Sequence, residues 1–145
     1  MQKITPFLWF DGKLEEAVKF YATVFHNARV ENVSRWSAHF VLDGQEIMAL
    51  NGGPQFKFNE AVSFYVRCET QDEVDYYWHK LTNDGGAESQ CGWLKDKFGL
   101  SWQVIPNALG QYLGDRDRKK AVRVVQAMRN MKKIDIAALE AAYAG

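Results

Sequence analysis

The chain has 145 residues, of which 47% are hydrophobic and 25% charged, and its formal net charge is zero. This length fits one domain or two small fused modules, and the composition excludes a disordered or collagen-like chain. A zero net charge argues against a dedicated nucleic-acid-binding protein, and the apolar runs are too short to span a membrane. Two cysteines without CxxC spacing, and no signal region, are typical of a cytoplasmic protein with free thiols.

The chain opens with a strand followed by a helix. Residues 4–10 are β-branched and aromatic and predict a strand, in which Pro6 lacks one ladder hydrogen bond. A helix is expected after Asp11-Gly12. Its apolar stripe has a helical period: Leu14, Ala17, Val18, Tyr21 and Phe25.

Short strands are expected next, over residues 29–36 and 38–42. Asp43-Gly44 then predicts a tight two-residue hairpin, because glycine tolerates the positive φ of a type I′ turn. The segment 51–54, Asn-Gly-Gly-Pro, breaks the chain and is expected to link two halves.

The second half repeats this order of elements. Residues 61–66 predict a strand, and Thr70 with Glu73 forms a capping box at the start of the next helix. That helix is expected to end at Asp84, and strands follow over 88–94 and 100–105.

An internal duplication explains this pattern. Asp11 and Glu69 both close a first strand, and Gly44 and Gly99 both precede a last strand, so the two copies are offset by about 55–58 positions. Each copy is a βαβββ unit whose helix must pack on its own small sheet. We therefore expect an α+β fold of two tandem modules over residues 1–114, the first about 1–54 and the second about 55–114.

A helical extension is expected over residues 115–145. An apolar stripe with basic residues opposite it predicts one helix: Ala121, Val124, Val125, Met128 and Met131. Asp135 is the expected N-cap of a last helix, with Ile134 placed to pack on Leu139. These helices are amphipathic enough that they should cover the sheet or a partner subunit.

The chain resembles the vicinal-oxygen-chelate superfamily, the fold of glyoxalase I, bleomycin-resistance proteins and extradiol dioxygenases. Several segments are similar to its PhnB-like branch: ITPFLWFDGKLEEAVKFY, DGQEIMALNGGPQFKFNEAVSFYVRCET, EVDYYWHKL, CGWLKDKFGLSWQVIP and MKKIDIAALEAAYAG. Members often carry the label 3-demethylubiquinone-9 3-methyltransferase. That activity is not expected here, because the sequence has no Gly-rich strand-to-helix loop for S-adenosylmethionine. The chain also has a shorter segment between its second and third strands than similar members.

The resemblance implies where a divalent metal would bind. Enzymes of the superfamily take ligands from the first and last strands of each module, and the repeat offsets carry those positions onto Thr5, Met48, Ser63 and Gln103. Of these, Gln103 alone is a plausible ligand for a hard or borderline cation. We therefore expect no metal and no cofactor.

The other chemistry-bearing residues have simple structural explanations. The histidines, His26, His39 and His79, are expected at the surface or at helix ends. Cys91 could be a nucleophile, but no neighbouring residue in sequence supplies a base. The basic run 116–120 with Arg123 is better explained as a solvated helix face than as a phosphate or nucleic-acid site, since no aromatic residues alternate with it.

The site proposed from the sequence is a small-molecule pocket, and the alternative is that the same side chains fill the space between the modules. Alternation along the strands would place apolar, aromatic and hydroxyl side chains on a shared lining: Thr5, Phe7, Trp9, Met48, Leu50, Ser63, Tyr65, Ser101 and Gln103.

The leading hypothesis is a homodimeric protein that binds a small molecule without a metal. The first alternative is a metal-dependent isomerase, lyase or dioxygenase whose ligands have shifted position. The second is a protein that binds a partner through its basic helix. Nucleic acid would be such a partner, but the sequence does not favour it. The resemblance implies the dimer and leaves open whether modules pair within a chain or between chains.

Overall fold

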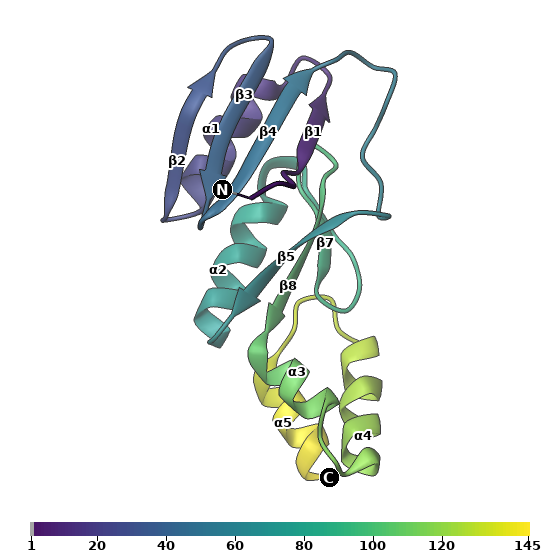
Figure 1. Cartoon of the computed structure of the whole chain (residues 1–145). Coiled ribbons are helices and arrows are strands. Elements are labelled where there is room, and N and C mark those ends of the chain that lie inside the picture. The colour runs from purple at the N-terminus through teal and green to yellow at the C-terminus, as the bar shows by residue number, and fades with distance from the viewer. Residues whose placement is uncertain (1) are drawn as a thin grey trace. The chain divides into compact units, whose positions relative to one another are not determined.

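The computed structural model describes residues 2–145 and divides the chain into two compact units, with the boundary between Phe58 and Asn59. Each unit contains one four-stranded sheet with a helix packed on one face (Figure 1). We call the opposite face of each sheet its open face. Among the described residues, no helix has the length and apolar character to cross a membrane.

The first unit has the predicted order of strand, helix and three strands. Its elements are β1 (Phe7–Phe10), α1 (Leu14–Val24), β2 (Ala28–Val33), β3 (Ser37–Leu42) and β4 (Gln45–Asn51). The strand order is β1-β4-β3-β2, with β1 parallel to β4 and the other pairs antiparallel. β1 begins at Phe7, three residues later than expected. Pro6 has no amide to donate, although its carbonyl still accepts a hydrogen bond from the amide of Met48 at 3.0 Å.

The core of the first unit lies between α1 and the helix-covered face of the sheet. All five residues of the predicted apolar stripe are buried, and Tyr21 stacks on Phe40 of β3. The hairpin between β3 and β4 is formed as predicted, since Asp43 and Gly44 have φ values of 48° and 83°.

The second unit repeats the same sheet and adds a helical extension. Its elements are β5 (Ser63–Cys68), α2 (Gln71–Thr82), a 3₁₀ turn η1 (Asn83–Gly85), β6 (Ala87–Glu88), β7 (Trp93–Lys95), β8 (Ser101–Pro106), α3 (Asn107–Leu113), α4 (Arg118–Arg129) and α5 (Ile136–Ala144). The strand order β5-β8-β7-β6 is that of the first sheet, again with the first strand parallel to the last. The expected duplication is therefore present in the fold.

Two local features of the second unit follow from single side chains. Thr70 caps α2 by accepting from the amide of Glu73 at 3.2 Å, while the Glu73 carboxylate accepts from the amide of Glu69. The buried carboxylate of Asp96 closes the turn before β8, because it accepts from the amides of Phe98 and Leu100 and from the indole of Trp102.

The C-terminal helices pack on the second unit's sheet. Asp135 caps α5 as predicted, whereas α3 was not expected from the sequence. The helices enclose a buried apolar cluster to which β8 contributes one residue: Ile105, Leu109, Val124, Ile134 and Leu139. The end of the open face at Ile105 is thus covered by the chain's own extension.

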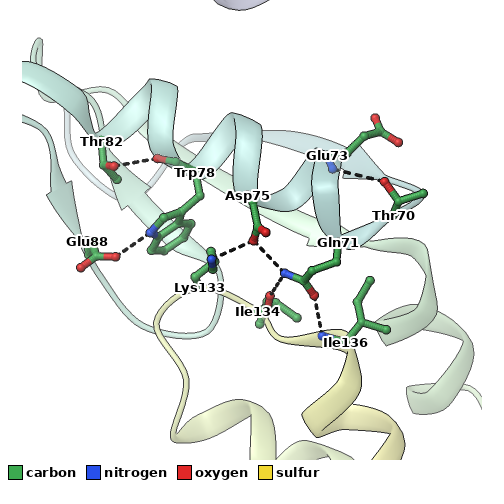
Figure 2. A network of polar contacts seen from close by, with 10 residues as sticks. All are labelled: Thr70, Gln71, Glu73, Asp75, Trp78, Thr82, Glu88, Lys133, Ile134 and Ile136. Atoms are coloured by element: carbon green, nitrogen blue, oxygen red, sulfur yellow. Dashed lines mark hydrogen bonds and ion pairs between the residues drawn. The ribbon is translucent and has the colours of Figure 1, made fainter.

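Polar contacts fasten this extension at two places. The side chain of Gln71 donates to the carbonyl of Ile134 at 3.0 Å and accepts from the amide of Ile136 at 2.8 Å, and Lys133 pairs with Asp75 at 2.7 Å (Figure 2). Beside this contact, the amides of Cys91 and Gly92 donate to the carbonyls of Met131 and Lys132, both at 2.8 Å.

Gly92 is required where the extension meets the sheet. Its φ is +86°, and a Cβ atom there would lie 2.6 Å from Cδ1 of Ile105 and 3.2 Å from Cγ1 of Ile134. Only a residue without a side chain fits this close approach.

The Gln71 contact yields a stability prediction. Gln71→Ala removes both hydrogen bonds to the extension, so we expect the free energy of unfolding to fall by about 1–3 kcal/mol. Urea unfolding checks this, and hydrogen exchange should become faster at the amides of Ile136 and Gly92. Gln126→Ala, at an exposed position of α4, is the matched control and should leave both quantities unchanged. Equal behaviour of the two variants would contradict the proposed role of Gln71.

Candidate functional site

The open face of the first sheet carries apolar side chains in register. Phe7 lies beside Met48, and Trp9 lies beside Leu50, across the parallel β1–β4 pair. Phe7, on the edge strand β1, is 53% exposed, and Met48, on the neighbouring strand β4, is 40% exposed, so this face leaves large apolar side chains in contact with solvent. Thr5 is partly buried and precedes β1. Four of the five lining residues expected in this module therefore share one face.

Trp9 also has a structural role that the sequence did not indicate. Its indole nitrogen donates to the carbonyl of Gly53 at 2.9 Å, and its ring packs edge-on against Phe56 at 5.0 Å. A Cβ atom on Gly52 would lie 2.3 Å from the ring. Trp9 thus holds the Gly-Gly-Pro segment against the sheet.

A histidine and a carboxylate share this open face. His39 lies on β3 directly beside Met48, and its Nε2 is 3.8 Å from Oε1 of Glu46 on β4. His39 is therefore in a strand and partly buried, rather than at the surface or at a helix end as expected, whereas His26 and His79 are exposed. The sequence could not reveal this pair, because it depends on the register between two strands.

The open face of the second sheet carries the four expected residues of the second module. Ser63 lies beside Ser101, and Tyr65 lies beside Gln103, across the parallel β5–β8 pair. The amide nitrogen of Gln103 donates to Oγ of Ser63 at 3.0 Å. Tyr65 is 51% exposed, whereas Ser101 is fully buried and its Oγ has no hydrogen-bond partner among residues 2–145.

Two further residues of β7 extend this face. Lys95 lies beside Ser101, and Trp93 lies beside Gln103, across the antiparallel β7–β8 pair. The Lys95 ammonium is 2.8 Å from the carboxylate of Glu60, and this hydrogen bond and charge hold the pKa of Glu60 below its usual value. Lys95 and Trp93 were not among the predicted lining residues, because β7 has only three residues and its pairing cannot be deduced from alternation.

The four positions that the superfamily uses for metal do not fit a divalent cation in this chain. Thr5 and Ser63 offer neutral hydroxyls, Met48 offers a soft thioether, and the amide nitrogen of Gln103 already donates to Ser63. Within residues 2–145, no group of three or more His, Cys, Asp or Glu side chains gathers closely enough to hold a metal ion. The side chains at these positions therefore give no basis for a metal-dependent step.

The basic helix is largely occupied by contacts within the chain. Arg123 donates to the carbonyls of Ala142 and Tyr143 at the end of α5, at 2.8 and 2.7 Å. Arg118 donates to the carbonyls of Leu113 and Asp115, and Lys120 lies 4.8 Å from the ring centre of Tyr143. These cations stabilise helix ends, so Lys120 and Arg123 are partly buried by contacts within the chain rather than lying on the solvated helix face that was expected.

The two cysteines are free and differ in environment. Cys91 is partly exposed in the turn before β7. Cys68 is fully buried at the end of β5, and loss of solvation, with a smaller contribution from the nearby Glu73 charge, raises its pKa to about 12. The Cys68 thiol is therefore protonated and unreactive at neutral pH.

Two tandem βαβββ units, each with its first and last strands paired in parallel, define a glyoxalase-like protein of the vicinal-oxygen-chelate superfamily. The chain belongs to the family described as 3-demethylubiquinone-9 3-methyltransferase, whose model matches residues 2–105. The match ends at Ile105, so the C-terminal segment quoted for the resemblance lies outside it. No curated protein matches the chain.

Solved structures agree with this assignment. A PhnB protein from Bacillus cereus is 39% identical, with a TM-score of 0.67 over 72% of this chain and 99% of its own. The fosfomycin resistance protein FosX from Listeria monocytogenes, solved with Mn(II) and sulfate, is 15% identical with a TM-score of 0.58, over 78% and 96% of the two chains. A glyoxalase/bleomycin resistance protein from Albidiferax ferrireducens is 11% identical with a TM-score of 0.54, over 73% and 99%. The last two show the fold alone.

The burial of Cys68 yields a reactivity prediction. In a Cys91→Ser variant, Cys68 is the remaining thiol, and we expect no reaction with a thiol-specific disulfide reagent at pH 8 in the native state, because the thiolate is scarce and the sulfur is buried. One equivalent should react once the protein is unfolded in guanidinium. Rapid reaction of the native variant would show that this part of the core is open.

Proposed function

We propose that this protein binds a small, partly apolar molecule without a metal ion, and that the open face of the second sheet contributes the binding groups. The observation that carries the proposal is the row Tyr65–Gln103–Trp93. It places an amide between two aromatic side chains on a face that the helix α2 leaves uncovered. A largely apolar surface with a few polar groups is the usual composition of a small-molecule site.

The donor set supports metal independence. A single neutral amide oxygen, left on Gln103 after its nitrogen has bonded to Ser63, cannot compete with water for a divalent cation. The Mn(II) with which FosX was solved belongs to that protein, whose low identity to this chain carries the fold and not the ligands.

We do not propose methyltransferase activity for this protein, although the family carries that label. Binding of S-adenosylmethionine is usually provided by a Gly-rich turn between a strand and a helix in a parallel sheet. Here β1 leads to α1 through Asp11-Gly12-Lys13, and β5 leads to α2 through Glu69-Thr70, in sheets of four mixed strands.

We further propose that the protein is a cytoplasmic homodimer. Exposed apolar side chains on the first unit support dimerisation, because a monomer would leave them in water: Phe7, Val30, Val33, Trp36, Met48 and Phe56. The two free cysteines support a reducing compartment.

Binding can be tested with a neutral aromatic probe, naphthalene-1-carboxamide. We expect a dissociation constant near 1 mM, about what a compound of this size reaches in a site with few polar contacts. Saturation-transfer NMR and titration of tryptophan fluorescence measure it. Tyr65→Ala should weaken binding severalfold, whereas Tyr65→Phe keeps the ring and should not. Absence of binding to the wild-type protein would contradict the proposed function.

Subunit number and metal content are tested together by a native mass spectrum of the untagged protein after incubation with Zn²⁺, Ni²⁺ and Mn²⁺. We expect a dimer at micromolar concentration with no retained divalent ion. Phe7→Glu combined with Met48→Glu should give a monomer, whereas Lys19→Glu on the exposed side of α1 should remain dimeric. A wild-type monomer would refute the dimer, and one ion per chain would refute metal independence.

A further inference from the structure

Three polar side chains form a row across the open face of the second sheet. Ser63 on β5 and Lys95 on β7 both lie directly opposite Ser101 on the central strand β8. Directly opposed residues in adjacent strands point to the same face, so the three side chains are neighbours on that face. We call them the Ser–Ser–Lys row.

The middle member of the row has an unmet hydrogen bond. Ser101 is fully buried and its Oγ has no partner among the described residues. Buried polar groups are almost always hydrogen-bonded, so an orphaned hydroxyl calls for an explanation, and an absent ligand atom is one. Neither neighbour in the row bonds to it, because the Ser63 hydroxyl accepts from Gln103 and the Lys95 ammonium pairs with Glu60.

The row as a whole presents donors. Oγ of Ser63 already accepts from the Gln103 amide, so its own hydrogen is free to be donated. Lys95 carries three donor hydrogens and a positive charge. Two hydroxyls and an ammonium ion side by side complement a group with several acceptor oxygens and a negative charge.

Glu60 is the acidic partner of Lys95, and this ion pair lies in solvent. The side chains of Lys95 and Glu60 are 42% and 63% exposed. An exposed ion pair is weak, so a ligand anion can replace the Glu60 carboxylate at little cost. A ligand oxygen that bonds to the enclosed Ser101 hydroxyl also requires a neighbouring side chain to move, and Lys95, which lies directly opposite Ser101, is long and flexible.

The adjacent row indicates the rest of the ligand. Tyr65, Gln103 and Trp93 lie two residues further along the same three strands, at a spacing of about 7 Å on the same face. A molecule whose oxyanion meets the Ser–Ser–Lys row would therefore lay its body between the two aromatic rings. That body is flat and apolar.

We propose that the Ser–Ser–Lys row is a carboxylate-binding subsite, and that the small molecule bound by this protein is an aromatic or similarly flat carboxylic acid. This inference rests on the proposed function and names the class of its ligand. In the bound state, Ser101 and Ser63 donate to the carboxylate oxygens, and Lys95 transfers its ion pair from Glu60 to the ligand.

The test compares 1-naphthoate with its neutral counterpart, naphthalene-1-carboxamide, at pH 7 and low salt. We expect the carboxylate to bind about tenfold more tightly, because charge-assisted hydrogen bonds replace neutral ones. Lys95→Met should abolish this preference. Glu60→Gln should increase the affinity for 1-naphthoate, because it removes the carboxylate that competes for Lys95, and this opposite sign separates a specific contact from general disruption.

Ser101→Ala supplies a readout that a structural role would not give. A serine needed for folding would lower the stability when it is removed. Removal of an orphaned buried hydroxyl should instead leave the urea midpoint of the free protein unchanged or higher. Affinity for 1-naphthoate should nevertheless fall severalfold.

The outcomes separate this inference from the proposed function. If neither compound binds, both fail. If the carboxamide binds and 1-naphthoate binds no more tightly, or if Lys95→Met and Ser101→Ala leave the preference unchanged, the carboxylate subsite is overturned and the proposed function stands.

Discussion

The parallel pairing between the first and last strands of each repeat is the constraint on which the molecule depends. Parallel neighbours cannot be joined by a tight turn, so each chain segment must cross over through a helix and return through antiparallel strands. The helix then covers one face of its sheet. The pairing also fixes which residues lie together on the other face, because Phe7 must accompany Met48, and Tyr65 must accompany Gln103.

The two copies of the repeat have the same backbone arrangement, but their open faces carry different side chains. Glu46 and Ser101 hold the same position relative to the β1–β4 and β5–β8 pairs, two residues before Met48 and Gln103. In the first sheet this position gives a carboxylate beside a histidine. In the second it gives a buried hydroxyl beside a lysine. The duplication therefore preserved the register while the chemistry of the open faces diverged.

The elements that the sequence predicted well are those governed by local rules. The Asp43-Gly44 hairpin, the caps at Thr70 and Asp135 and the repeat itself depend on residues close in the chain, and they were predicted correctly. The helix α3 was missed because it is short, contains the poor helix former Gly110 and has no side-chain cap at its start. Lys95 was missed for another reason: its place beside Ser101 is set by tertiary pairing. For the expected lining residues, the sequence predicted which of them share a face of each sheet, because alternation along a strand is a local property.

The contact at Gly92 between the second sheet and the C-terminal helical extension determines where the chain can be truncated. The match to the family model ends at Ile105, yet Ile105 is packed with Leu109 and Ile134 from the later helical segment, and the amides of Cys91 and Gly92 donate to the carbonyls of Met131 and Lys132. A fragment cut at the family boundary would expose the apolar end of β8 and leave the amides of Cys91 and Gly92 without their acceptors, which favours aggregation through the exposed apolar surface. The part of the chain that matches the family is therefore not a complete folding unit here, because the segment after Ile105 supplies the side chains and carbonyls that close the end of the second sheet.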